Sequence, residues 1–173
     1  MMTMDTSITS INNISEYLRL VSGEETLVVG PTDGKRTIAG EDNVFTGHIN
    51  SDFKSWGLDV KGNPCGPTKV AVHEIIKDGN FQQIFSGLSP DLNSLCLEQD
   101  QVLEFVKHRS KWLRTDRYAT FFLCKADGEF FVASVFFDGY SRLIVSAHRL
   151  SFGHVWFAGF RLRVVVPQLT LAN

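Results

Sequence analysis

The C-terminal third of the chain consists of short runs of aromatic and β-branched residues separated by turn sequences. We predict strands at residues 120–124, 129–137 and 142–148, and a last strand within 155–166 that ends at Pro167. Asp127-Gly128 and Asp138-Gly139 lie between consecutive runs, and such pairs favour the tight turns of β-hairpins. The pattern therefore predicts a C-terminal antiparallel β-meander over about residues 118–166.

Three pairs of adjacent phenylalanines mark this predicted sheet: Phe121-Phe122, Phe130-Phe131 and Phe136-Phe137. Because neighbouring side chains of a strand point to opposite faces, each pair places one ring on each side of the sheet. A sheet that is apolar on both faces needs cover on both. We expect helices on one face, the N-terminal segments or a second subunit on the other, and the cationic side chains at the rim.

Apolar residues at helical spacing occur in the first two thirds of the chain. They predict amphipathic helices at residues 11–21, 81–88 and 98–109, and a helix start at Ser89-Pro90-Asp91. Strands are predicted at 26–29, 36–39 and 69–76, the first two as a hairpin around Asp33-Gly34. We therefore expect an α+β fold in a single domain, residues 1–173, with a mainly antiparallel sheet packed with several short helices.

Charge is distributed unevenly along the chain, although the net charge is only −2. Residues 1–106 contain 7 Lys and Arg against 15 Asp and Glu, a balance of −8. Residues 107–173 contain 10 Lys and Arg against 4 Asp and Glu, a balance of +6. This segregation indicates either an anionic partner for the C-terminal part or mutual neutralisation of the two parts in the fold.

The cysteines and the N-terminus bear on the cellular compartment. Cys65, Cys96 and Cys124 are odd in number and widely spaced, which favours reduced thiols in a cytoplasmic protein. The N-terminus lacks the pattern of a secretory signal, and no apolar run approaches the ~20 residues of a membrane span. The sequence predicts neither a membrane partner nor a cofactor.

The segment from Lys107 to Tyr118 is the strongest candidate for a binding surface. It contains five Lys and Arg against one acid, with Trp112 and Tyr118 among them. Basic side chains can neutralise phosphates while aromatic rings stack on unpaired bases. The candidate binding residues are Lys111, Trp112, Arg114, Arg117 and Tyr118. Alternatively, Trp112 fills the core at a helix-to-strand junction, and Arg114 and Arg117 pair with acids from residues 1–106.

A second candidate surface is the irregular stretch at residues 40–68, rich in Gly, Asn, Asp and Pro. Long loops inside compact domains are often functional. Phe53 and Trp56 could line a ligand pocket there. They could also anchor the loop onto the core, which is the interpretation we favour.

Catalytic and nucleotide-binding motifs fail on spacing. Residues 30–37 have three residues between glycines where a P-loop needs four, and Arg36 follows the lysine where a hydroxyl is required. His73-Glu74 begins like a zinc-protease motif, but position 77 is Lys rather than His. The remaining enzyme hypothesis is a site formed in three dimensions by His148, His154 and Asp138, with surface or core roles as the alternative for the histidines.

Several motifs together resemble a family of bacterial proteins to which no function is assigned. They are residues 111–116 (KWLRTD), 118–123 (YATFFL), 129–133 (EFFVA) and 163–169 (RVVVPQL), with 22–27 (SGEETL), 56–60 (WGLDV) and 77–81 (KDGNF) upstream. The resemblance covers most of the chain and implies a shared fold and a bacterial origin. It implies no activity. The stretch 159–162 (GFRL) departs from the more polar, acid-containing stretch expected there.

Four functions are compatible with these patterns. The leading hypothesis is a non-enzymatic binding protein whose basic C-terminal part docks on an acidic macromolecule, either protein or nucleic acid. The second is a nucleic-acid-binding protein that uses the segment from Lys107 to Tyr118. The third is the small enzyme described above, and the fourth is a self-associating protein, such as a homodimer, that uses the Phe-rich sheet as its contact.

Overall fold

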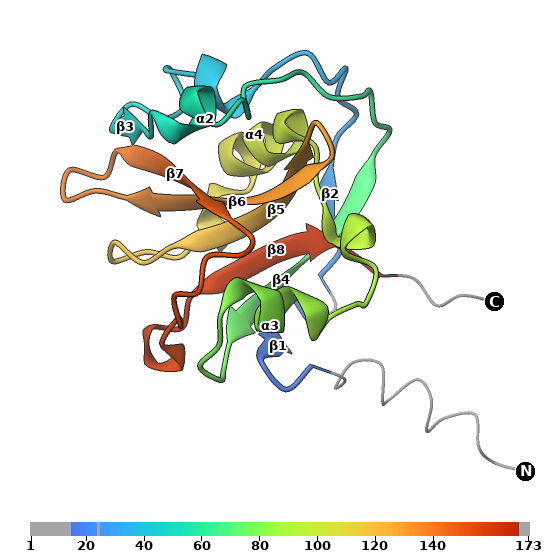
Figure 1. The fold of residues 1–173 in the computed structure, drawn as a ribbon, viewed down its shortest axis with the longest axis vertical. Helices are drawn as coiled ribbons and strands as arrows, with labels where there is room; N and C mark the ends of the chain where they lie inside the picture. Colours follow the sequence, from blue (N-terminus) through green and yellow to red (C-terminus); the bar gives the residue numbers. More distant parts are fainter. Residues whose placement is uncertain (1–14, 24, 170–173) are drawn as a thin grey trace, which may run out of the picture.

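The computed structural model describes residues 15–23 and 25–169, and their core is an eight-stranded sheet (Figure 1). Its strands are β1 (Leu18–Leu20), β2 (Leu27–Val29), β3 (His48–Ile49), β4 (Thr68–Ile75), β5 (Thr120–Ala126), β6 (Glu129–Phe137), β7 (Leu143–Arg149) and β8 (Arg163–Pro167). The strand order is β1-β4-β8-β5-β6-β7-β3, and β2 also pairs with β4.

The helices are short. They are α2 (Asp52–Ser55), α3 (Phe81–Ser86) and α4 (Gln99–His108), with the 3-10 helices η1 (Ile38–Gly40), η2 (Leu92–Leu95), η3 (Ser110–Trp112) and η4 (Ala158–Phe160). Across the described ranges, none of the helices combines the length and hydropathy that crossing a bilayer requires. The predicted helices at 81–88 and 98–109 are confirmed as α3 and α4. The helix start at Ser89-Pro90-Asp91 leads into η2, where the Asp91 carboxylate accepts a hydrogen bond from Asn93 N.

The α+β class is confirmed, but the sheet is mixed. β5, β6 and β7 form the predicted meander with antiparallel pairing. β8 does not continue it: this strand inserts between β4 and β5, antiparallel to β4 and parallel to β5. β3 is also parallel to β7. The chain after β7 therefore crosses the β6 and β5 positions before it re-enters the sheet, and that crossing segment forms a wall of the site described below.

The sheet is apolar on both faces, as the phenylalanine pairs predict. Phe122 and Phe131 are fully buried in one hydrophobic cluster, whereas Phe121 is buried in the other, with Phe130 packed against it. Figure 1 shows α4 and α3 on opposite sides of the sheet. The chain's own elements therefore cover both faces around these rings.

Each covering helix has the apolar face that its spacing predicts. α4 buries Val102, Phe105 and Val106 against the first cluster, and a capping box between Glu98 and Gln101 closes its N-terminus. α3 buries its apolar residues, Phe81, Ile84 and Phe85, in the second cluster, behind a capping box between Asn80 and Gln83. α3 has only six residues, so it covers only part of its face of the sheet.

Two predicted elements in the N-terminal half are wrong. The first part of the helix at 11–21 lies outside the described residues, and its last part contains the strand β1, in which Leu18 pairs with Ile75. Residues 36–39 are not the second strand of a hairpin, because they run into η1 and β2 pairs with β4 instead. In both places a partner more than 40 residues away decides the backbone conformation.

The turn at Asp33-Gly34 is held by α4 rather than by a neighbouring strand. Asp100 is almost completely buried, and its carboxylate accepts hydrogen bonds from Gly34 N (2.9 Å) and from Nε of Arg36 (2.6 Å). Arg36 also donates to Glu104 at 2.6 Å. Residues 62–65 supply the backbone partner of this turn, since Gly62 N donates to the Gly34 carbonyl and Thr32 and Cys65 exchange two backbone hydrogen bonds.

The three cysteines are free thiols. Cys124 is fully buried in the sheet core, and burial raises the pKa of its thiol well above the usual value. Burial likewise raises the pKa of Cys96 to about 12. Because the thiolate is the reactive form, these two side chains are inert at neutral pH.

Candidate functional site

A cleft of about 490 Å³ opens on the α3 side of the sheet, where α3 leaves β6 and β7 uncovered. Its floor consists of Ser134 and Phe136 of β6 with Ser146 and His148 of β7, and Ser134 lies directly opposite Ser146 in the sheet. Its walls come from residues 117–119, before β5, and from the loop between β7 and β8. We call it the aromatic cleft.

The β7–β8 loop is anchored beside α3 by Trp156. Its ring lies 5.1 Å from the ring of Phe81 and 4.8 Å from that of Phe121. Trp156 and Gly79 also exchange two backbone hydrogen bonds, and Ala158 N donates to Asp78. The loop is therefore a fixed wall, built by contacts between segments about 75 residues apart.

On either side of Trp156 the loop turns large apolar side chains toward solvent. Val155, Phe157 and Phe160 are 55%, 54% and 44% exposed. Phe160 stacks on Tyr118 with 5.0 Å between ring centroids, and Phe157 meets Phe160 edge to face. Exposed aromatic side chains gathered around one cleft are unusual on a protein surface and mark interaction sites.

Basic side chains border this aromatic surface. The guanidinium of Arg114 lies 5.0 Å from the Tyr118 ring centroid and donates to the carbonyls of Arg161 (2.9 Å) and Phe160 (3.2 Å). Arg117 and Arg161 are exposed. We call Arg114, Arg117 and Arg161 the basic rim.

The basic rim has no carboxylate partner at ion-pair distance within residues 15–23 and 25–169. In the same residues, the ion pairs of the acidic part are internal to it, as in Arg19–Glu74 and Arg36–Asp100, and one contact, His108–Glu104, joins the two parts. Burial lowers the pKa of Arg163, and the nearby charge of Arg114 lowers it further. The two parts of the chain therefore do not neutralise each other through ion pairs here.

Strained backbone accompanies the rim. Asp116, Arg117 and Arg161 have φ angles of 60°, 69° and 54°, in the left-handed region that side chains other than glycine rarely adopt. Such conformations cost free energy and occur preferentially at functional sites. They turn Arg117 so that its guanidinium lies against Gly139 in the β6–β7 turn, across one end of the cleft.

The other predicted residues of the basic segment have structural roles. Trp112 is half-buried and packs against the core below α4, while its carbonyl accepts a hydrogen bond from Arg163 at 2.8 Å. The ammonium of Lys111 lies 5.9 Å from the Trp112 ring. Trp112 therefore anchors the helix-to-strand junction, and of the five predicted residues only Arg117 and Tyr118 line the cleft.

The loop residues Phe53 and Trp56 act as anchors. Phe53 is fully buried and meets Phe131 edge to face at 6.0 Å. Trp56 is half-buried, with the guanidinium of Arg149 4.4 Å from its ring centroid. Phe53 therefore presents no surface to a ligand, whereas Trp56 borders a shallow cavity beside β7.

His148 and His154 come together, but Asp138 does not join them. Phe152 stacks on both imidazoles, at 5.3 Å from His148 and 5.7 Å from His154. Asp138 lies in the turn before the first residue of β7, whereas His148 is close to the last residue of that strand. The Asp138 carboxylate instead accepts hydrogen bonds from Tyr140 N and from Arg142. The proposed triad is therefore not formed, because the length of β7 separates its members.

The two imidazoles have no third ligand beside them in the described residues. Burial lowers the pKa of His148, and the neighbouring His154 lowers it further. In the described part of the chain, no three His, Cys, Asp or Glu side chains are placed to hold a metal ion. The histidines contribute aromatic surface to the cleft wall.

The sequence analysis missed Trp156, Phe157 and Phe160, because residues 155–162 read as the start of the last strand. A signal was available: four large apolar side chains follow Gly153-His154 without the alternation of a strand. Comparison with known proteins adds no further assignment, since no family model, curated protein or solved structure matches the chain.

Proposed function

We propose that this chain is a binding protein for single-stranded nucleic acid, which it engages through the aromatic cleft and the basic rim. The observation that carries the proposal is the contact of the exposed Phe160 ring with Tyr118 and, through Tyr118, with Arg114, which has no carboxylate partner among the described residues. Bases stack on aromatic rings irrespective of their identity, and guanidinium groups neutralise the phosphates between them.

An unpaired strand fits this surface better than a duplex or an acidic protein. In a duplex the bases are paired and stacked inside the helix, so rings in a cleft reach them only when the strand is single. Acidic peptide side chains would occupy the basic rim but would leave Phe157 and Phe160 uncovered.

Fluorescence anisotropy with labelled oligothymidine tests the proposal. We expect the association constant to fall steeply as salt rises from about 50 to about 200 mM, because cations are released from the phosphates. Arg117→Ala removes one exposed charge and should reduce the slope of log K against log salt by about 0.7. Lys61→Ala, an exposed lysine in the loop before β4, is the matched control and should leave the slope unchanged.

Competition decides between the possible partners. Unlabelled oligothymidine should displace the probe, whereas polyglutamate of equal charge should not. Displacement by polyglutamate at equal concentration would assign the surface to acidic proteins instead. Absence of any salt-sensitive association with oligothymidine would refute the proposal.

A further inference from the structure

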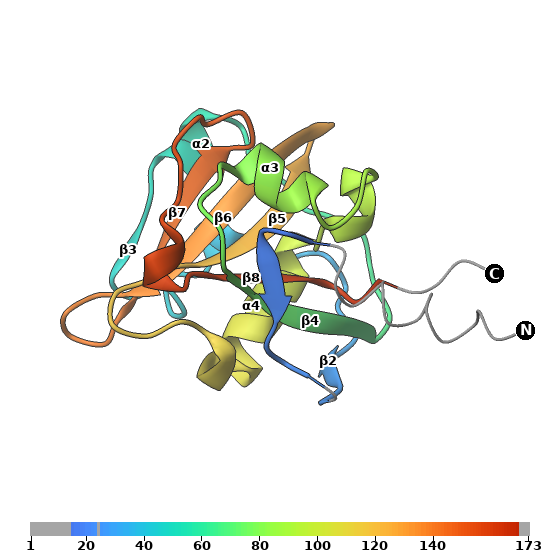
Figure 2. The ribbon, with the colours of Figure 1, turned by 90° about the horizontal axis from the view of Figure 1, so that it is seen from below.

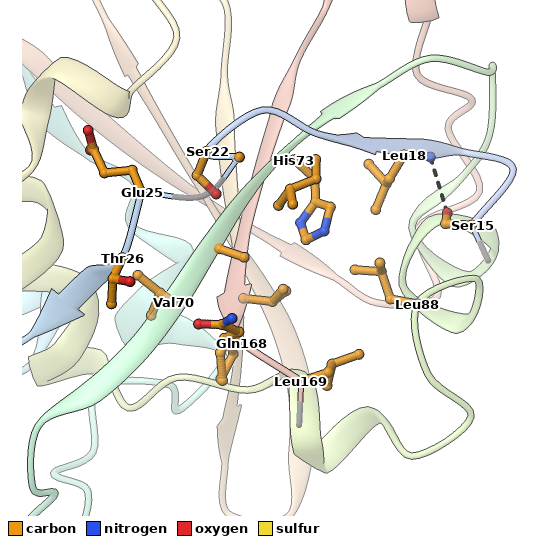
Figure 3. Close-up of a pocket in the computed structure, with 15 residues that line it drawn as sticks. Ser15, Leu18, Ser22, Glu25, Thr26, Val70, His73, Leu88, Gln168 and Leu169 are labelled. Atoms are coloured by element: carbon orange, nitrogen blue, oxygen red, sulfur yellow. Dashed lines mark hydrogen bonds between the residues drawn. The ribbon is translucent and has the colours of Figure 1, made fainter. Parts of the chain in front are cut away.

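A second cavity, of about 220 Å³, lies near the β1 edge of the sheet and shares no lining residue with the aromatic cleft (Figure 3). Figure 2 shows β1 and β4 on the side of the sheet away from β3 and β7. It exists because two short strands share one partner: β1 pairs with residues 73–75 of β4, and β2 with residues 68–70. Between them, the Val72 carbonyl accepts hydrogen bonds from Val21 N and Ser22 N, and Val72 N donates to the Ser22 hydroxyl. The side chains at this gap are small, as at Ser22, Gly23 and Ala71, so they leave space.

The walls of this cavity combine a polar part, which includes Ser22, Thr26 and Gln168, with an apolar part. The apolar part is formed by Leu18, Leu20, Leu88, Val166 and Leu169, which come from β1, the turn after α3, β8 and the segment after it. None of the described side chains that line it is a Lys or Arg, and its one carboxylate, Glu25, is exposed at the mouth. The cavity therefore offers no cation to an anionic ligand.

His73 supplies a polar group that has no partner in the described structure. Its imidazole projects from β4 toward Leu18 and Leu88 (Figure 3). Nδ1 is fully buried and makes no hydrogen bond. A buried polar atom without a partner is costly, and the polar atoms of native interiors are nearly always satisfied. Burial also lowers the pKa of His73 to about 4, so the ring is neutral at pH 7 and can accept or donate one hydrogen bond at each nitrogen.

We propose that this cavity binds a small neutral molecule, made of one apolar ring and one hydrogen-bonding group, that contacts Nδ1 of His73. The ring occupies the space between the leucines, and the polar group satisfies the imidazole. A dry apolar cavity of about 150 Å³ holds benzene, so the larger volume here accommodates a ring with a short substituent. An anionic ligand is excluded, because the lining provides no cation to compensate for its desolvation.

NMR titration of the full chain with three probes of similar size tests this inference. p-Cresol carries a ring and a hydroxyl, toluene has the ring alone, and benzoate has the ring with a negative charge. We expect saturable shifts of residues that line the cavity with p-cresol, about fivefold weaker binding of toluene, and no binding of benzoate. p-Cresol should also shift the ¹⁵N resonance of His73 Nδ1, whereas toluene should not.

Three variants distinguish the contribution of the hydrogen bond to His73 from that of the cavity volume. His73→Leu should weaken p-cresol about fivefold, to the affinity of toluene, and leave toluene unchanged. Ala71→Ile, which fills the cavity, should abolish binding of both. Glu25→Gln is the control and should alter neither affinity, because the ligand is neutral.

Several outcomes would overturn the inference. These are the absence of saturable shifts in the wild type, p-cresol binding that leaves the His73 imidazole resonances unmoved, and tighter binding of benzoate than of p-cresol. The wild-type imidazole titration decides the question even if His73→Leu fails to fold.

Discussion

The guanidinium of Arg114 lies 5.0 Å from the ring centroid of Tyr118. The same guanidinium donates hydrogen bonds to the carbonyls of Phe160 and Arg161, on the loop that returns from β7. Arg114, from the basic segment, thus holds the loop that carries Phe160 against Tyr118, two residues before β5. The charge and the aromatic surface of the proposed site are therefore built as one unit.

Removal of this arginine should loosen the wall without unfolding the sheet. Arg114→Ala loses two hydrogen bonds to carbonyls and one cation–π contact, which together stabilise the fold by about 1–2 kcal/mol. Urea denaturation should show this loss, and amide hydrogen exchange should accelerate within residues 157–163. Arg117→Ala, an exposed control, should change neither measurement. Unaltered exchange in Arg114→Ala would show that the loop is held by other contacts.

The buried carboxylate of Asp100 should be the most sensitive polar group within the described part of residues 1–106. Asp100→Ala removes the acceptor for Gly34 N and for Arg36, so a guanidinium and a buried N–H lose their partner. We expect a loss of about 3 kcal/mol in the free energy of unfolding. Glu104→Ala removes the more exposed partner of Arg36 and should cost about 1 kcal/mol. Equal losses in the two variants would contradict the structure.

Gly34 should tolerate no side chain, for steric reasons as well as conformational ones. It has a φ of +78°, and a Cβ there would lie 2.6 Å from the backbone carbonyl of Asn63. Gly128 has a similar φ of +84° with open space around it. We expect Gly128→Ala to cost about 1 kcal/mol and Gly34→Ala about 3 kcal/mol, measured by urea denaturation. Similar costs would mean that loop 59–67 yields to the new methyl group.

The burial of His73 predicts a pH dependence of stability. The pKa of this imidazole is about 4 in the folded chain and about 6.5 when unfolded, so the unfolded state binds more protons between these values. Stability should therefore fall as pH decreases from about 6.5 to 4, by up to roughly 3 kcal/mol. Urea denaturation at several pH values should show this fall in the wild type and a smaller one in His73→Leu. Parallel curves for the two proteins would contradict the assignment.

Local sequence signals predicted the elements whose partners are close in the chain. The β5–β6 hairpin followed from Asp127-Gly128, and Asp127 and Gly128 adopt the positive φ angles of such a turn, 49° and 84°. The two covered faces followed from Phe121-Phe122 and Phe130-Phe131, because strand geometry alone separates neighbouring side chains. These inferences needed no knowledge of tertiary contacts.

The errors arose where a distant segment determines the local structure. Leu18 has helical spacing to Val21, yet β4 provides the hydrogen bonds that make it a strand. The aromatic cleft could not be predicted for the same reason. It depends on the contacts of Trp156 with Phe81 and of Arg114 with Phe160, which join segments far apart in the chain. The basic segment could be predicted because its charged residues are close together in the sequence. Which of them are exposed at the rim, as Arg117 is, and which anchor the fold, as Trp112 does, depends on packing.

Ultraviolet cross-linking of the full chain to oligothymidine, followed by peptide mass spectrometry, tests the central claim most directly. Aromatic side chains in stacking contact with thymine cross-link to it, so the positions of the adducts report where the bases lie. The account predicts adducts at Tyr118, Phe157 or Phe160, which high salt suppresses and which the control Lys61→Ala retains. Adducts confined to other surfaces, or salt-insensitive binding without adducts in residues 117–160, would contradict it.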